Sequence, residues 1–111
     1  MELGMRVIVT DHHQIGESPV TCEAVLNPVL GGYPFSKLCG AGVALKLVQA
    51  MGGLEAVRPL LDLAALATVA DLVPLIDENR VLVSEGLAAM RHTRRLDARE
   101  EIALGSHVGT P

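Results

Sequence analysis

Aromatic side chains are nearly absent from this sequence. It contains no Trp, one Tyr and one Phe, although half of its 111 residues are hydrophobic. The core must therefore be built from Leu, Val, Ala and Ile. Proteins that hold single-stranded nucleic acid commonly stack its bases on aromatic side chains. The shortage argues against this segment gripping a single strand by itself.

An excess of positive charge is lacking as well. The 9 Lys and Arg residues are outnumbered by 13 Asp and Glu residues, which gives a formal net charge of −4. Proteins that attract nucleic acid electrostatically usually carry a basic patch. A polyanionic substrate would need help from metal ions or from further domains.

Cysteine is also scarce, and long apolar runs are missing. Cys22 and Cys39 lack CxxC-type spacing, so neither a disulfide framework nor a zinc knuckle is indicated, and we interpret both as small core residues. Residues 1–6 lack the basic start and apolar stretch of a secretory signal. The segment Leu60–Ile76 is too short and too charged to span a bilayer. We expect a cytoplasmic protein without membrane contact.

Two short strands are predicted in the first third of the chain. The run Val7–Thr10 is apolar without alternation, which is typical of a buried strand with helices on both faces and strands on both sides. Ala24–Leu26 is a second short candidate, ended by Asn27 and Pro28.

Three helices are predicted in the remainder. Their ranges are Leu38–Met51, Leu60–Ala70 and about Asn79–Arg91. The first should stop at Gly52 and Gly53. The second is apolar on nearly every side except at Asp62 and Thr68, so we expect it to be buried all round. The third carries Val83, Leu87 and Met90 at helical spacing.

Strands followed by helices over short Gly and Pro connections indicate an α/β fold with room for one domain. Two strands cannot form a stable parallel sheet by themselves. We therefore expect this chain to be part of a larger domain, with N-terminal strands missing from it.

Asp11, His12 and His13 are the strongest candidate site residues, because they lie at the end of a strand, where open α/β sheets place their ligands. Asp71 closes another apolar segment and is a candidate partner. Imidazole and carboxylate groups suit a divalent cation that hydrolyses phosphate esters. Successive side chains alternate, so one histidine can bind metal while the other faces substrate. Surface polar residues, and a helix-capping role for Asp71, remain open alternatives.

Other candidates are weaker. Gly40-Ala41-Gly42 could approach a phosphate, but close helix packing is the favoured interpretation. A cluster of arginines could meet a phosphate backbone, although a solvated helix end explains it equally well; its members are Arg91, Arg94, Arg95 and Arg99. His92 and His107 have no partner in the sequence and are interpreted as surface residues.

Two segments carry a family resemblance. The run from Val7 to His13, VIVTDHH, resembles the third motif of the DHH phosphoesterase superfamily. The stretches LCGAGVA, from Leu38, and LAALATVADLVPL, from Leu63, resemble the RecJ-like branch of single-strand-specific 5′ exonucleases. Other branches typically carry Asp-Thr where this chain has Asp71-Leu72. The resemblance extends over about Leu3–Leu96.

This resemblance implies roles for individual residues. His12 and Asp71 would be ligands of Mn²⁺ or Mg²⁺ in a two-metal site. His13 would face the scissile phosphate, and Asp11 would support it or act as a further ligand. The substrate would be single-stranded DNA, degraded from its 5′ end.

Departures from the family pattern limit the expected activity. The first two motifs, which supply further metal-binding aspartates, would lie before Met1, so we expect a truncated piece that is inactive alone. Ala67 replaces a usual glycine. Residues 1–96 are interpreted as the C-terminal part of a DHH catalytic domain and 97–111 as a divergent, flexible tail. A phosphodiesterase of short oligonucleotides or cyclic dinucleotides, and a non-catalytic binding module, are the alternatives.

Overall fold

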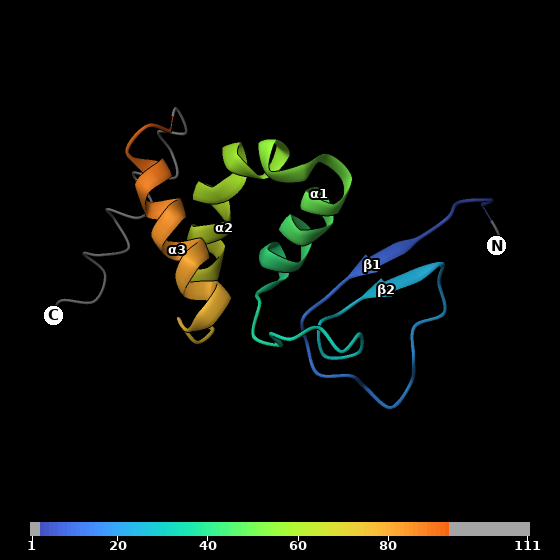
Figure 1. Cartoon of the computed structure of the whole chain (residues 1–111). Helices are drawn as coiled ribbons and strands as arrows, with labels where there is room; N and C mark the ends of the chain where they lie inside the picture. The colour runs from blue at the N-terminus through green and yellow to red at the C-terminus, as the bar shows by residue number, and fades with distance from the viewer. Residues whose placement is uncertain (1–2, 94–111) are drawn as a thin grey trace, which may run out of the picture.

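The computed structural model describes residues 3–93 and shows a small parallel strand pair beside a group of helices (Figure 1). Strands β1 (Ile8–Thr10) and β2 (Ala24–Leu26) pair with Val9 opposite Val25. They are followed by α1 (Gly40–Val57), the 3-10 turn η1 (Arg58–Leu60), α2 (Leu61–Ala70) and α3 (Asp77–Met90). Helix α1 lies between the strands and the α2–α3 pair. The predicted α/β class, with a partial parallel sheet and flanking helices, is confirmed.

The prediction that β1 is a buried strand is wrong for the described residues. Ile8 is 58% exposed, and Val7 beside it is exposed as well. Helix α1 is the principal helix that contacts β1. An apolar run without alternation is typical of a strand that is covered on both faces by other elements. Residues 3–93 contain too few helices and strands to cover β1 in this way.

Helix α1 continues past its predicted stop. Gly53 has φ 68° and ψ −169°, which breaks the helix, and helical structure then resumes as far as Val57. Only glycine adopts such a conformation without strain. The Gly52-Gly53 pair therefore produces a kink rather than an end.

The prediction that α2 is buried all round is wrong, because only one face of it is buried. Asp62 and Thr68 are buried, whereas Leu63 and Val69 are exposed. The buried face also includes Ala64 and Ala65, and the small side chain of Ala65 lets α3 approach closely at Gly86. The inward hydroxyl of Thr68 donates to the Ala64 carbonyl at 2.6 Å, so its burial costs little.

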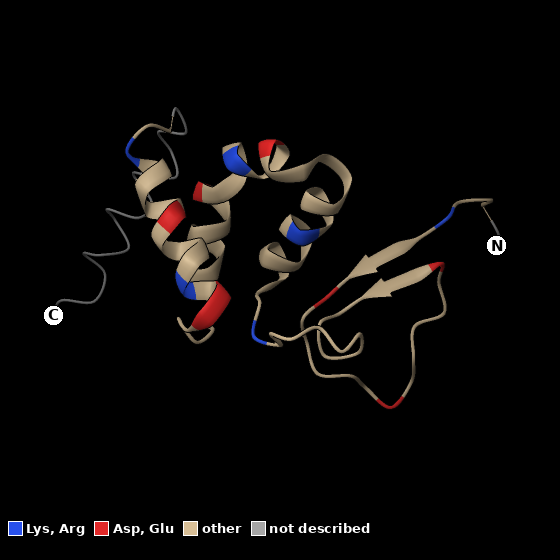
Figure 2. Cartoon of the chain, viewed as in Figure 1, with Lys and Arg blue, Asp and Glu red and all other residues tan. Residues whose placement is uncertain are grey.

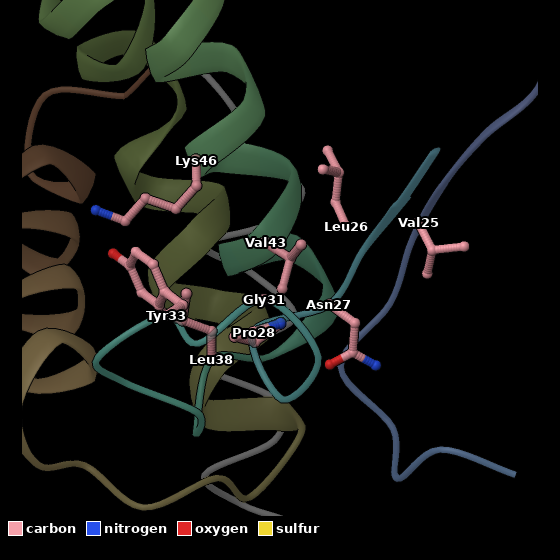
Figure 3. A pocket seen from close by; sticks show the side chains of 9 residues that line it. All are labelled: Val25, Leu26, Asn27, Pro28, Gly31, Tyr33, Leu38, Val43 and Lys46. Carbon is pink, nitrogen blue, oxygen red and sulfur yellow. The ribbon is translucent and has the colours of Figure 1, made fainter. Parts of the chain in front are cut away.

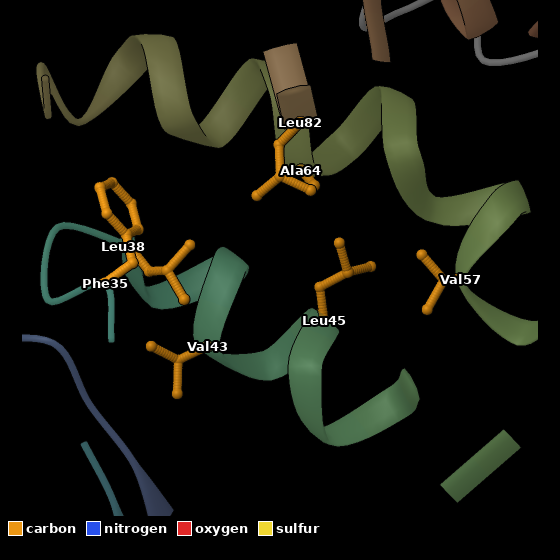
Figure 4. Close-up of a cluster of buried hydrophobic side chains, with 7 residues drawn as sticks. All are labelled: Phe35, Leu38, Val43, Leu45, Val57, Ala64 and Leu82. Atoms are coloured by element: carbon orange, nitrogen blue, oxygen red, sulfur yellow. The ribbon is translucent and has the colours of Figure 1, made fainter. Parts of the chain in front are cut away.

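Helix α3 begins two residues before its predicted start, with Asp77 and Glu78 in its first turn, where negative charge favours the helix dipole. Its inner face carries Leu82, Val83 and Gly86, while Leu87 is exposed. The described core joins all three helices and the loop before α1; its members are Phe35, Leu38, Val43, Leu45, Val57, Ala64 and Leu82 (Figure 4).

Among residues 3–93, no helix is long and apolar enough to cross a membrane. The divergent C-terminal segment predicted at 97–111, together with Arg94, Arg95, Arg99 and His107, lies outside the described residues.

Candidate metal-binding site

His12 and Asp71 meet although they lie far apart in the sequence. His12 follows β1, and Asp71 is the C-cap of α2. His12 Nε2 lies 3.4 Å from Asp71 Oδ2, and the two side chains are 19% and 43% exposed. The structure thus brings together the imidazole and carboxylate that the sequence paired. Their role as metal ligands stays a prediction.

A pocket of about 360 Å³ opens beside this pair. It is lined by small residues as well as by the two candidate ligands: His12, Cys39, Gly40, Ala41, Ala67, Ala70 and Asp71. A Cβ added at Gly40 would lie 3.7 Å from His12 Cδ2, in ordinary contact, so the imidazole packs against the first residue of α1. We interpreted Gly40-Ala41-Gly42 as a place of close helix packing, and that interpretation is compatible with its position beside the pocket. The positive end of α1 also lines the pocket, which favours bound anions.

The Asp11 carboxylate contacts the ring of His13, and it contacts His12 through the backbone N–H. Its Oδ1 accepts hydrogen bonds from the backbone N–H groups of His12 at 2.8 Å and His13 at 3.2 Å, and it lies 2.6 Å from His13 Nδ1. These bonds, led by the His13 side chain, lower the pKa of Asp11 below its ordinary value. Of the two roles considered for Asp11, the geometry favours the supporting one.

His13 faces solvent beside the candidate ligand pair. Its ring centroid lies 4.3 Å from that of His12, tilted by 44°. Because Nδ1 is held by Asp11, Nε2 is the ring nitrogen left to meet a substrate. The arrangement suits the prediction that one histidine binds metal while the other faces substrate.

The donor chemistry fits a divalent cation, but the number of donors is low. Imidazole nitrogen and carboxylate oxygen both bind Mn²⁺, and oxygen donors suit Mg²⁺. Within residues 3–93, no group of three or more His, Cys, Asp or Glu side chains is arranged to hold a metal ion. His12 and Asp71 could therefore supply only some of the ligands of a metal site, and the other ligands would have to come from groups outside residues 3–93.

Two supporting residues were missed in the sequence. Thr68 Oγ1 lies 3.5 Å from Cys39 Sγ, which joins α2 to the residue that precedes α1. Asn27, interpreted only as a strand end, donates from Nδ2 to the carbonyl of His13 at 2.9 Å. A hydrogen-bonding side chain directly after a short strand was the available signal for Asn27.

Of the remaining candidates, Cys39 lines the pocket, whereas Cys22, Arg91 and His92 do not. Cys39 is buried, as expected, and Cys22 is half-buried; both thiols are free. His92 is exposed and Arg91 caps α3. Neither lines the pocket beside His12 and Asp71.

Residues 1–68 match the model of the DHH family, N-terminal domain. The chain belongs to the DHH family. It is 49% identical over 111 residues to the single-stranded-DNA-specific exonuclease RecJ of Bacillus subtilis, covering 97% of this chain and 14% of that relative. The predicted family membership is confirmed.

Two further RecJ proteins are also similar to this chain. RecJ of Thermus thermophilus is 45% identical over 91 residues, covering 79% of this chain and 14% of the relative. RecJ of Escherichia coli is 39% identical over 105 residues, covering 80% and 18%. The chain thus spans less than a fifth of the length of these relatives. No solved structure matches it significantly.

Proposed function

We propose that this DHH chain supplies one part of the catalytic centre of a RecJ-like exonuclease that hydrolyses single-stranded DNA from its 5′ end with two divalent metals, Mn²⁺ or Mg²⁺. The observation that carries the proposal is the approach of His12 Nε2 to Asp71 Oδ2 at 3.4 Å. The RecJ relatives, whose names specify single-stranded DNA, support the substrate class.

The geometry supports a proposed role for each candidate residue. His12 and Asp71, which both line the pocket, would hold a cation. When bound, a divalent cation supplies charge that polarises a phosphodiester and activates water. Asp11 holds His13 Nδ1, so that Nε2 is free to approach a phosphate oxygen. The positive N-terminal end of α1 also favours the negatively charged phosphate.

Alone, the described chain should be inactive. Two protein ligands are too few to fix two cations in the geometry that hydrolysis needs. Acidic and basic positions are interspersed along the ribbon rather than gathered into a basic stripe over residues 3–93 (Figure 2). We therefore propose that further ligands and most of the DNA contact come from other parts of a longer protein.

A chimera tests this proposal. Residues 3–93 replace the matching segment of Bacillus subtilis RecJ, and degradation of 5′-labelled single-stranded DNA is measured with Mn²⁺. We expect the chimera to be active, and His12→Ala or Asp71→Asn to lower its rate by more than about a hundredfold, since losing even an outer-shell partner of a metal costs 10- to 100-fold.

His92→Ala is the matched control and should leave the chimera's rate unchanged. A folded chimera that stays active without His12 and Asp71 would contradict the proposal. Selective cleavage of dinucleotides or cyclic dinucleotides, with long strands left intact, would favour the alternative phosphodiesterase. A folded chimera without any phosphodiesterase activity would favour the binding module.

A further inference from the structure

The segment that carries Asp11, His12 and His13 lacks a helix to hold it. Residues 11–23 connect β1 to β2 as a loop (Figure 1). Parallel strands are usually joined by a crossover that contains a helix packed on the sheet. The direction of the His13 side chain must therefore be fixed by individual hydrogen bonds.

Asn27 makes one of these bonds from the end of β2. Its Nδ2 donates to the His13 carbonyl at 2.9 Å, and its Oδ1 accepts from the Val29 N–H at 3.0 Å. The residue is buried. Figure 3 shows its amide directed toward the blue segment that follows β1, away from the labelled side chains of Tyr33 and Lys46. Because both ends of the amide are used, its orientation is fixed.

Asp11 holds the same histidine from the other side. The Asp11 N–H donates to the Leu26 carbonyl at 3.0 Å, which extends the β1–β2 pairing. Its carboxylate then bonds both the backbone and the ring of His13. Asn27 thus fixes the backbone of His13 while Asp11 fixes its ring.

We propose that Asn27 is a positioning residue that sets the direction of His13 Nε2 toward a substrate phosphate. The substrate part of this inference rests on the function proposed above. An asparagine suits the position, because one end must donate to a carbonyl and the other must accept from an N–H. An aspartate would place an oxygen against the His13 carbonyl.

The test uses Asn27→Asp in the ¹⁵N-labelled chain. We expect the ring ¹⁵N signals of His13 to shift as its Nδ1 contact with Asp11 is lost. Hydrogen exchange at the His13 amide should accelerate by about tenfold, because release of the His13 carbonyl would also loosen the 3.2 Å bond from this amide to Asp11 Oδ1. The ring signals of His12 should shift less than those of His13, since Gly40 and Asp71 hold that ring although it also lies 4.3 Å from the His13 ring between centroids.

Asn79→Asp provides the matched control. Asn79 is fully buried, and its Nδ2 donates to the carbonyls of Lys37 and Pro74. Its substitution should lower the melting temperature without moving the His13 signals. If Asn27→Asp does not fold, Asn27→Ser is measured instead. The serine side chain is too short to donate to the His13 carbonyl, and it adds no charge.

Unchanged His13 signals in a folded Asn27 variant would overturn the inference. Equal shifts of the His13 signals in Asn79→Asp would also overturn the inference, because they would show that Asn27 affects His13 only through the overall stability of the fold. Failure of Mn²⁺ to bind at His12 and Asp71 would count against the proposed function alone, since the His13 signals are recorded without metal.

Discussion

Leu72, directly after Asp71, combines two costly features at the residue scale. It has φ 57° and is 89% exposed. A left-handed conformation costs a side chain with a Cβ roughly 1–2 kcal/mol. An exposed leucine recovers little of that cost by burial. The strain lies beside a candidate ligand, where such outliers tend to gather.

Replacing this leucine should therefore stabilise the chain. We expect Leu72→Gly to raise the free energy of unfolding by about 1 kcal/mol, because glycine is the usual residue after a helix C-cap. Urea unfolding measures the change. Leu87→Gly, at an exposed position inside α3, should instead lower stability by about 1 kcal/mol. A loss of stability in Leu72→Gly would show that the side chain makes a contact that outweighs the strain.

Candidate site residues could be named from the sequence, but the contacts between them could not. A strand end and a helix end identify Asp11, His12, His13 and Asp71 as candidates, because backbone patterns are local. The choice of His13 over His12 as the partner of Asp11 depends on side-chain rotamers within the loop. No spacing rule fixes those. The bond from Asn27 to His13 depends equally on how β2 pairs with β1.

At the scale of elements, α2 and α3 make the closest helix contact. A Cβ added at Gly86 would lie 2.2 Å from Ala65 Cβ and 2.3 Å from the Leu61 carbonyl oxygen. No real contact is that short. The two helix backbones can approach only because this position has no side chain.

Gly86→Ala should consequently be strongly destabilising. We expect a loss of about 1–3 kcal/mol from overpacking, although alanine is the better helix former. Thermal unfolding followed by circular dichroism measures it. Gly16→Ala is the control, since a Cβ there meets nothing within 4 Å and the backbone is not left-handed. Equal stability of Gly86→Ala and the parent chain would contradict this helix contact.

The helices could be located from sequence, but the inner face of α2 could not. Periodicity identifies apolar and polar positions, and in α2 nearly every position is apolar. Helix contact then selects small side chains, so Ala64 and Ala65 turn inward and Leu63 stays exposed. The buried Thr68 is tolerated because its hydroxyl bonds to its own helix.

At the scale of the whole molecule, a polar cluster joins the loop after β2 to two helices. Tyr33 Oη donates to Glu78 Oε2 at 2.8 Å, and Lys46 forms an ion pair with Glu78. Burial raises the pKa of Tyr33 above 10.0, and Glu78 raises it further. Burial alone would lower the pKa of Lys46, but Glu78 outweighs it and raises the pKa above 10.5.

Stability should therefore fall in alkaline solution. Both folded-state pKa values exceed the unfolded ones, so this contribution is complete below about pH 10 and is lost as the pH rises through the folded values. Urea unfolding between pH 8 and 11, a range that spans the ordinary values near 10, measures the loss. Glu78→Gln should flatten the dependence, whereas Glu85→Gln on the same helix should not. Equal slopes in all three proteins would contradict the assignment.

The exposure of Val7 and Ile8 could not be predicted from the sequence pattern. Val7 and Ile8 are apolar enough for a covered sheet, yet both are exposed in the described chain. The apolar residues of a strand indicate that it is suited to a buried environment. They do not show which elements are present to provide that environment.

Manganese binding to the chain itself tests the central claim most directly. Paramagnetic Mn²⁺ is titrated into the ¹⁵N-labelled protein, and amide broadening is mapped by residue. We predict that broadening centres on His12, Gly40 and Asp71, and that His12→Ala or Asp71→Asn abolishes it while His92→Ala leaves it intact. Broadening that centres elsewhere, or that survives both substitutions, would contradict the metal site.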